Sequence, residues 1–333
     1  MAWFKSNEGI TIAQNIYLNT LKIIKLAAEL NGITEGIVKN DFFFNLRNSF
    51  DIIQKEYYKT IISILNILIS GKHDENVSNS CFEFFKHTQN LKFIENFNML
   101  KDLHNKELII EVLAFLSALC RKSSEIYNTI HQLNIFPDLK NLLENSNETS
   151  FKSRVCNLLG NMCRHTDFFY EQIKSSGIIV PLLKCCYEKD KATRKFACFA
   201  IGNAAFLNDK LYECFRPIIP RMVELLHDQE ENTRANSAGA LGNFVRCGET
   251  LCDDIINAKA HEALINLAET EEIAQIQIIR VALFALGNFC NHAKIKQELD
   301  KINFRQRIEN IKEKFRNDRQ LMEHIERIQK KLN

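Results

Sequence analysis

Proline and glycine are scarce in this chain, with 4 and 11 copies among 333 residues. Both residues interrupt regular helices, so their scarcity favours helix and argues against a disordered or an all-β chain. Long apolar runs are missing too: residues 61–69, the longest, are too few to cross a bilayer and include Ser63 and Asn66. The first residues contain no apolar segment of the signal-peptide kind. We therefore expect a helical, soluble and cytoplasmic protein.

An excess of charge of one sign is also missing. Lysine plus arginine number 43 and aspartate plus glutamate 41, which gives a formal net charge of +2. A chain that binds DNA or RNA through an overall basic field carries a larger excess of positive charge. We therefore expect no nucleic-acid partner.

Motifs of catalysis and metal binding do not occur in these residues. We find no His-Glu-x-x-His, no Gly-x-Ser-x-Gly and no phosphate-binding loop. The pairs Cys163-x-His165 and Cys290-x-His292 each supply only half the ligands of a zinc site. The eleven cysteines form no Cys-x-x-Cys pair, and we expect them to be buried, reduced thiols. The sequence predicts a protein that is not an enzyme and holds no cofactor or metal.

A short motif recurs four times in the second half of the chain. Each copy is a leucine or isoleucine followed by Gly-Asn, with the glycines at Gly160, Gly202, Gly242 and Gly287. These glycines are 42, 40 and 45 residues apart (202−160, 242−202, 287−242). A period of about 40 residues is typical of stacked helical repeats, which present long surfaces to other proteins.

Proline marks a second helix in the same repeats. Pro137, Pro181 and Pro220 each precede or begin a leucine-rich stripe, and they are 44 and 39 residues apart (181−137, 220−181). Proline is tolerated in the first turn of a helix because the N–H that it lacks would be unbonded there. The prolines therefore predict the starts of helices that alternate with the Gly-Asn helices.

Helical geometry divides each Gly-Asn helix into two sides. With the asparagine as position 0 and 100° per residue, positions −6, −3, −2 and +1 fall together and carry apolar or small residues, which predicts the core. Glycine at −1 lies on the flank, where its missing side chain lets the next helix approach closely. The asparagine side carries positions −7, −4, 0 and +3, and helix stability alone gives asparagine no reason to recur there.

We predict a protein-binding groove on the asparagine side, with Asn161, Asn203, Asn243 and Asn288 in one row on a concave face. Its aromatic members are expected either to anchor a partner or to be covered by the neighbouring repeat. The predicted groove residues are Arg154, Asn157, Asn161, Arg164, Phe196, Phe199, Asn203, Phe206, Asn236, Asn243, Arg246, Phe284, Asn288 and Asn291.

Repeat signals weaken toward the N-terminus. Glu56–Ser70 and Ile16–Leu30 have helical apolar spacing, whereas Gly71–Ser80 is polar and is expected to be a surface loop. No linker rich in proline, glycine or serine marks a domain boundary. We therefore predict degenerate helical repeats in residues 1–110 and well-formed repeats in residues 111–300.

The tail, residues 301–333, is basic. It holds ten lysines and arginines against five acidic residues, a balance of +5 (10−5), on two amphipathic helices. A terminal repeat needs a charged outer face, so we expect a solvated cap; the alternative is docking on an acidic surface such as the tubulin lattice. The predicted basic residues are Arg305, Arg307, Lys312, Lys314 and Arg316.

A helix that starts at proline, followed by a helix that ends in small-x-Leu-Gly-Asn, resembles the armadillo repeat. Residues 159–165, 194–205, 208–212 and 233–243 resemble more specifically the C-terminal armadillo region of the Fused family of serine/threonine kinases. The resemblance is close from Phe151 to Asn291. It implies an all-α, right-handed superhelical solenoid of the armadillo/HEAT kind, with about seven repeats, in which the asparagines bind the backbone of an extended ligand.

Two departures from known families limit what the resemblance implies. The chain has no Gly-x-Gly-x-x-Gly, His-Arg-Asp or Asp-Phe-Gly motif, so it lacks the parts of a kinase domain. It is either the armadillo portion of a longer polypeptide or a kinase-less relative, and Met1 favours the second. Nuclear-import receptors of the importin-alpha type carry a tryptophan four residues before each asparagine, and here the only tryptophan is Trp3. An importin-like cargo receptor is therefore disfavoured.

The Fused resemblance implies a cytoskeletal setting, since members of that family associate with kinesin-like proteins. We expect a non-catalytic adaptor in a microtubule-based assembly, with the central apparatus of the ciliary axoneme as the leading setting and a kinesin-like or coiled-coil partner. The alternative is a regulatory armadillo region that acts on a kinase domain. No membrane contact is expected.

Overall fold

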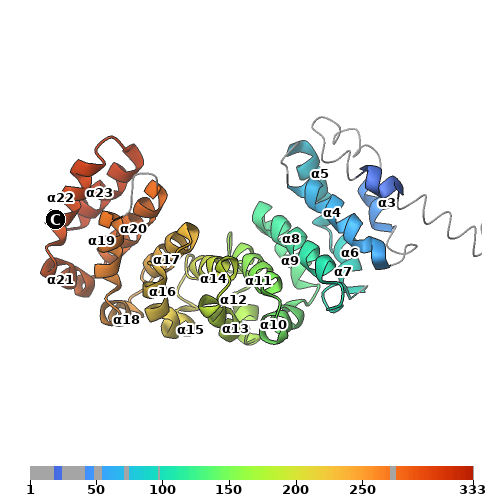
Figure 1. Ribbon diagram of the computed structural model, residues 1–333, viewed down its shortest axis with the longest axis horizontal. Helices are drawn as coiled ribbons and strands as arrows, with labels where there is room; N and C mark the ends of the chain where they lie inside the picture. The colour runs from blue at the N-terminus through green and yellow to red at the C-terminus, as the bar shows by residue number, and fades with distance from the viewer. Residues whose placement is uncertain are drawn as a thin grey trace, which may run out of the picture. The chain divides into compact units, whose positions relative to one another are not determined.

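A computed structural model describes residues 19–24, 42–48, 55–70, 75–96, 98–270 and 275–332 (Figure 1). Within these residues every regular element is a helix and none is a strand. No helix in this part of the chain is long and apolar enough to span a membrane. The chain forms two compact units, Met1–Leu139 and Lys140–Asn333. The all-α class that the scarcity of proline and glycine predicts is confirmed.

Unit 1, Met1–Leu139, is a stack of helices around branched and aromatic side chains. Helix α4 (Tyr58–Ile69) packs on α8 (Lys106–Lys122) and on α5 (Glu75–Phe85). Phe85 of α5 meets Phe115 of α8 edge to face, with ring centroids 5.2 Å apart. The other helical segments that begin in this unit are α3 (Phe42–Asn48), η3 (Lys55–Tyr57), α6 (Thr88–Leu91), α7 (Phe93–Asn96), η4 (Ser124–Ile126), α9 (Tyr127–His131) and α10 (Phe136–Asn145).

Unit 2, Lys140–Asn333, is a row of long helices with shorter helices between them. The long helices pack successively, and Figure 1 shows α14 and α17 on one side of the unit with the shorter α13, α15 and α18 on the other. The long helices are α11 (Thr149–Met162), α14 (Lys191–Ala204), α17 (Glu231–Asn243), α20 (Ile276–Phe289) and α23 (Arg319–Leu332). The shorter elements are α12 (Tyr170–Ser175), α13 (Ile179–Lys184), η5 (Cys185–Tyr187), α15 (Tyr212–Phe215), η6 (Arg216–Ile218), α16 (Ile219–Leu225), α18 (Cys252–Asn257), α19 (Ala260–Thr270), α21 (Ala293–Lys301) and α22 (Phe304–Lys314).

Acidic residues cap the starts of two long helices. Asp190 accepts a hydrogen bond from the Thr193 N–H at 2.7 Å, and Glu230 accepts one from the Thr233 N–H at 2.6 Å. Each cap satisfies one of the free N–H groups of the first turn and places negative charge at the positive end of the helix dipole. The polar residues that precede each apolar stretch in the sequence are therefore the helix starts.

The proline and core predictions are both confirmed. Pro137, Pro181 and Pro220 lie in the first turns of α10, α13 and α16. Every residue at positions −6, −3, −2 and +1 of the four Gly-Asn helices is buried. The local 3.6-residue periodicity therefore located the core side of each long helix correctly.

Most of the thiols belong to the cores, as the sequence predicts. Nine of the eleven cysteines are buried, Cys214 is intermediate and Cys247 is exposed, and all are free. Burial raises the pKa of the Cys163 thiol to about 12, so this thiol stays protonated and unreactive near neutral pH. Among the described residues, no three histidine, cysteine or acidic side chains gather in a geometry that holds a metal ion.

One predicted loop is wrong, and one predicted helix lies mainly outside the described residues. Within Gly71–Ser80, helix α5 already begins at Glu75, because Val77, Cys81 and Phe85 repeat at four-residue spacing and bury one side of a polar stretch. Of Ile16–Leu30, only residues 19–24 are described, and they are helical.

The boundary between the two compact units differs from the boundaries that the sequence motif predicts. The sequence shows no linker, and accordingly the boundary between Leu139 and Lys140 falls inside α10. The predicted ranges, residues 1–110, 111–300 and 301–333, differ in how well each matches the repeat motif. The two compact units are defined by contacts in space, which do not depend on that match. That threefold division stays a prediction.

Glycine is required at some repeats more than at others. A Cβ added to Gly242 would lie 2.6 Å from Ala285 Cα, whereas one added to Gly202 would lie 3.6 Å from Ala240 Cβ, an ordinary contact. We expect Gly242→Ala to destabilise the protein by about 1–3 kcal/mol through overpacking. Gly202→Ala is the matched control, and we expect it to be neutral or to stabilise by up to about 1 kcal/mol through helix propensity. Urea unfolding of both variants measures this, and equal effects would contradict the close-approach argument.

Candidate protein-binding face

The recurring asparagines connect successive repeats. Asn203 Nδ2 donates a hydrogen bond to the Gly160 carbonyl at 2.9 Å, and Asn243 Nδ2 donates to the Gly202 carbonyl at 2.9 Å. Asn288 Nδ2 donates to the Gly242 carbonyl at 3.1 Å. Each of these three asparagines therefore binds the glycine that precedes the asparagine of the repeat before it. Asn161, in the first of the four helices, instead donates to the Asn157 carbonyl of its own helix at 3.0 Å.

This ladder explains why both residues of the Gly-Asn pair recur. The last four carbonyls of a helix have no partner within the helix, and each of these glycines lies in the last turn of its helix. At Gly160 and Gly242 the missing side chain also lets the next helix come near enough for an asparagine side chain to reach that carbonyl. The asparagine amide therefore satisfies a backbone acceptor that would otherwise be left unpaired next to the core.

Tyrosines add a second bond at the same helix ends. The Tyr170 hydroxyl donates to the Asn203 carbonyl at 3.3 Å, and the Tyr212 hydroxyl donates to the Asn243 carbonyl. Tyr212 also accepts a hydrogen bond from the Cys247 N–H at 3.2 Å. Each tyrosine begins a short helix in one repeat and fixes the end of the long helix in the next.

The last repeat replaces the ladder amide by an ammonium group. Lys331 lies 43 residues after Asn288 (331−288), and its Nζ donates to the Gly287 carbonyl at 2.7 Å. Arg327, four residues earlier, donates from Nη2 to Asn288 Oδ1 at 2.5 Å and lies over the Phe284 ring, 5.1 Å from its centroid. Sequence analysis missed both residues, although the repeat spacing extended past Asn288 would have found Lys331.

We call the side of α11, α14, α17 and α20 that carries positions −7, −4, 0 and +3 the asparagine face. Its most exposed row is position +3, with Arg164, Phe206, Arg246 and Asn291. The positions −7 and −4 are half-buried, and so is the ladder residue Asn203. The half-buried members are Arg154, Asn157, Phe196, Phe199, Asn203, Asn236 and Phe284.

Three of the four recurring asparagines are nearly covered. Asn161, Asn243 and Asn288 are 4%, 8% and 2% exposed. Because the Nδ2 atoms of Asn203, Asn243 and Asn288 are used between repeats, they are not free to bind a ligand backbone. Binding by the predicted groove residues stays a prediction, and the exposed row at position +3 is its accessible part.

The aromatic residues of this face divide between packing and exposure. The Phe199 ring occupies the space that a side chain at Gly160 would need, so Phe199 belongs to the contact between repeats. Phe206 is 37% exposed, and the Arg246 guanidinium lies over its ring, 3.8 Å from the centroid. Of the four predicted aromatic residues, Phe206 is the exposed one, and the other three are half-buried.

Three positive charges on or beside the asparagine face have no acidic partner within 4 Å among the described residues. Among the described residues, Arg246, Arg327 and Lys331 have no carboxylate within salt-bridge distance. Burial lowers the pKa of Arg327, and the charge of nearby Arg246 lowers it further. Burial lowers the pKa of Lys331, and the charge of Arg327 adds to the effect.

Two arginines in the first halves of long helices are paired across repeats. Arg194 Nε lies 2.6 Å from Asp228 Oδ2, and Arg280 Nη2 lies 2.5 Å from Asp318 Oδ2. In each pair the arginine lies in the first half of a long helix and the aspartate precedes the next long helix. The two ends of the long helices therefore differ in electrostatics.

The basic tail is only partly available to solvent. Arg307 Nε lies 2.7 Å from Glu269 Oε1, and Lys314 Nζ donates to the Glu269 carbonyl at 3.1 Å. Arg305 donates to the Leu332 carbonyl, Lys312 lies 3.6 Å from Glu309, and Arg316 is exposed. Several of these residues therefore attach α22 to its neighbours, and tubulin docking by the tail stays a prediction.

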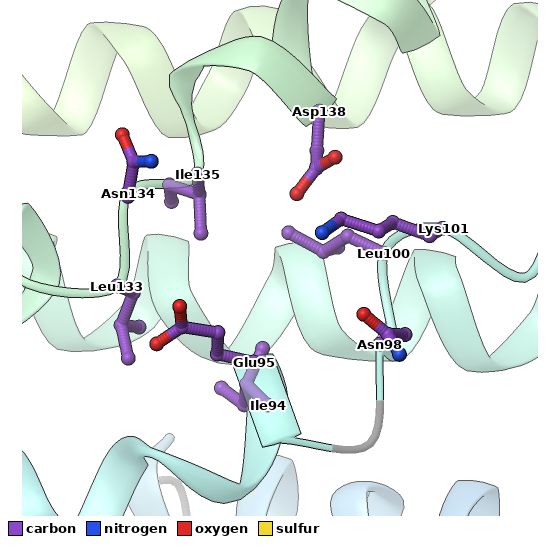
Figure 2. A pocket seen from close by; sticks show the side chains of 9 residues that line it. All are labelled: Ile94, Glu95, Asn98, Leu100, Lys101, Leu133, Asn134, Ile135 and Asp138. Carbon is purple, nitrogen blue, oxygen red and sulfur yellow. The ribbon is translucent and has the colours of Figure 1, made fainter.

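A small pocket in unit 1 is too small to be the binding site (Figure 2). It encloses about 60 Å³ and is lined in part by Glu95, Lys101 and Asp138. Burial raises the pKa of Asp138, and the nearby Lys101 charge opposes this rise. That volume is enough for a few water molecules and excludes a peptide or a cofactor.

Comparisons with known proteins relate the sequence of this chain to parts of two protein kinases. A scan against protein families finds no match. The chain is 36% identical over 219 residues to the serine/threonine-protein kinase TIO of Arabidopsis thaliana, and 29% identical over 188 residues to serine/threonine-protein kinase 36 of Pongo abelii. These matches cover 61% and 56% of this chain, and 16% and 13% of the kinases.

Solved structures agree on the fold. A designed armadillo repeat protein in complex with the peptide (KR)4 superposes with a TM-score of 0.64 at 18% identity, over 71% of this chain and 97% of that one. An engineered protein superposes with a TM-score of 0.69 at 15% identity, over 99% of this chain and 87% of that one. The chain has an armadillo-like fold, and its sequence resembles parts of Fused-family kinases. An armadillo-like solenoid with this sequence similarity supports a role as a protein-interaction scaffold.

The ladder can be tested by removing one amide. Asn243→Ala leaves the Gly202 carbonyl buried without a partner, so we expect a loss of about 1–3 kcal/mol in the free energy of unfolding. Asn291→Ala removes an exposed asparagine side chain of the same face, and we expect a change within about 0.5 kcal/mol. Thermal and urea unfolding give both values. If the two variants melt together, the ladder does not stabilise the repeats.

Proposed function

We propose that this protein is a non-catalytic adaptor whose asparagine face binds an extended segment of another protein. The observation that carries the proposal is the exposed row at position +3, which holds one side chain per repeat: Arg164, Phe206, Arg246 and Asn291. The residues at the core positions of the same helices are all buried. Packed helices lie about 8–10 Å apart, which is roughly three residues of an extended chain. A partner segment of about ten residues therefore reaches all four helices.

The setting that we propose is a microtubule-based assembly in the cytoplasm. The central apparatus of the ciliary axoneme is the leading case, and a kinesin-like or coiled-coil protein is the proposed partner. What supports this setting is the resemblance to Fused-family kinases, which is strongest in the repeats that form the asparagine face. Because the matched region is a small part of those kinases, their activities as whole proteins are not transferred to this chain.

Proximity labelling in ciliated cells tests both parts of the proposal. We expect the double variant Arg164→Ala with Phe206→Ala to lose its specific neighbours, since an exposed aromatic anchor is typically worth about 2 kcal/mol or more. The control is Val180→Ala with Tyr187→Ala, which removes side chains that are 60% and 59% exposed elsewhere in unit 2. Unchanged labelling by the first double variant contradicts the face, and neighbours without microtubule proteins contradict the setting.

A second candidate is a regulatory region that acts on a kinase domain. The observation that favours it is that the relatives found by sequence are themselves protein kinases. Mixing this chain with the purified catalytic domain of the plant relative would then change phosphorylation of a generic substrate. No change in rate and no co-elution of the two proteins would exclude regulation of that catalytic domain.

A further inference from the structure

The ends of α17, α20 and α23 bring three positive charges together on one side of unit 2. Arg246 follows the end of α17, while Arg327 and Lys331 lie in α23 and contact α20 through Asn288 and Gly287. The charge of Arg246 is near enough to lower the pKa of Arg327. We call Arg246, Arg327 and Lys331 the basic cluster.

Each member of the basic cluster is held in place by contacts that leave most of its donors unused. Arg327 is fixed by Asn288 Oδ1 and by the Phe284 ring, and a guanidinium carries five N–H donors. Arg246 is fixed by the Phe206 ring and the Phe206 carbonyl. Lys331 uses one of three donors on the Gly287 carbonyl. Their positions are therefore set before any ligand arrives, which lowers the entropic cost of binding.

Three partly buried arginines elsewhere in unit 2 are neutralised by carboxylates, whereas the basic cluster is not. Arg194, Arg280 and Arg307 each pair with a carboxylate from another repeat. No carboxylate of the described residues lies within 4 Å of a nitrogen of the basic cluster. A cleft along α23 is lined by Arg327 and Lys331 together with Glu323, Glu326 and Lys330. Both carboxylates are exposed, and neither pairs with the basic cluster. Partly buried positive charges without partners are costly, so an anionic ligand here gains an interaction that the free protein lacks.

We propose that the basic cluster binds the carboxylates of an acidic, extended segment of the partner protein. The inference rests on the proposed binding role of the asparagine face and names the chemistry of its occupant. Arg246 and Arg327 can each take a carboxylate bidentately, and Lys331 supplies a third point of charge. The Phe206 and Phe284 rings beside the two arginines favour a peptide that also carries apolar side chains. Nucleic acid is disfavoured because its affinity comes from many phosphate contacts, whereas two carboxylates, Glu323 and Glu326, lie beside the basic cluster and the net charge of the chain is only +2.

Binding of a labelled acidic peptide measures the proposal directly. The probe is a fluorescein-labelled twelve-residue peptide of alternating glutamate and alanine, followed by fluorescence anisotropy with the full chain at 50 mM and 200 mM salt. We expect saturable binding that weakens at the higher salt, because screening acts on contacts of this kind. The basic peptide (KR)4 should neither bind nor compete. A wild-type chain that does not bind the acidic probe overturns the inference.

The test variant removes both positive charges and leaves a shorter, uncharged amide side chain at each position. Arg327→Gln with Lys331→Gln retains amide donors at both positions, and we expect it to bind the acidic probe about tenfold more weakly and with little salt dependence. The control, Lys301→Gln with Arg316→Gln, changes net charge by the same amount at exposed sites of unit 2 and should bind within about twofold of wild type. Equal binding by test and control variants overturns the proposal.

Two further readouts separate this inference from its alternatives. If a twelve-nucleotide single-stranded RNA binds more tightly than the acidic peptide and the test variant loses it, the cluster is a nucleic-acid site and the proposal is overturned. If Arg164→Ala with Phe206→Ala abolishes partner labelling in cells while Arg327→Gln with Lys331→Gln does not, the proposed function stands and the acidic-segment inference fails. Thermal unfolding of every variant confirms that loss of binding is not loss of fold.

Discussion

The hydrogen bond from the Asn203, Asn243 and Asn288 amides to a glycine carbonyl of the preceding repeat is the interaction on which unit 2 depends. A helix cannot satisfy its own last carbonyls, and a glycine such as Gly242 brings the neighbouring helix near enough for an asparagine to reach one of them. The same bond fixes which turn of one long helix faces which turn of the next. Both requirements, close helix approach and a bonded carbonyl, apply to Gly242. It lies against Ala285, and its carbonyl accepts the hydrogen bond from Asn288.

The two ends of the long helices therefore have different tasks. The N-terminal halves are fixed by caps such as Asp190 and by ion pairs across repeats such as Arg194 with Asp228, so charge there is neutralised. The C-terminal ends are fixed by neutral amides and tyrosine hydroxyls, which leaves the charged side chains at position +3 directed outward. On the asparagine face, the amides therefore hold successive repeats together, while the side chains at position +3 stay exposed to solvent.

The last repeat shows what changes where the stack ends. Lys331 and Arg327 take the positions of a ladder asparagine and of the residue four before it, and they satisfy Gly287 and Asn288 with cationic donors. Asn243 Oδ1, by contrast, is buried and makes no hydrogen bond within the described residues. The residue in the register of Arg327 there is Phe284, which cannot donate. Replacing amides by cations keeps the backbone satisfied and concentrates positive charge beside the asparagine face.

The sequence by itself determined the helical class, the period of about 40 residues, the proline starts of α10, α13 and α16, and the core side of each long helix. All of these follow from local rules of spacing and propensity. Only the tertiary structure decided that the amide nitrogens of Asn203, Asn243 and Asn288 bind glycine carbonyls rather than a ligand, that Phe199 is covered while Phe206 is exposed, and that Arg327 and Lys331 complete the ladder. The physical reason is that each of these contacts joins groups about 40 residues apart in the chain, and helical periodicity fixes a side chain's direction without fixing what lies opposite it.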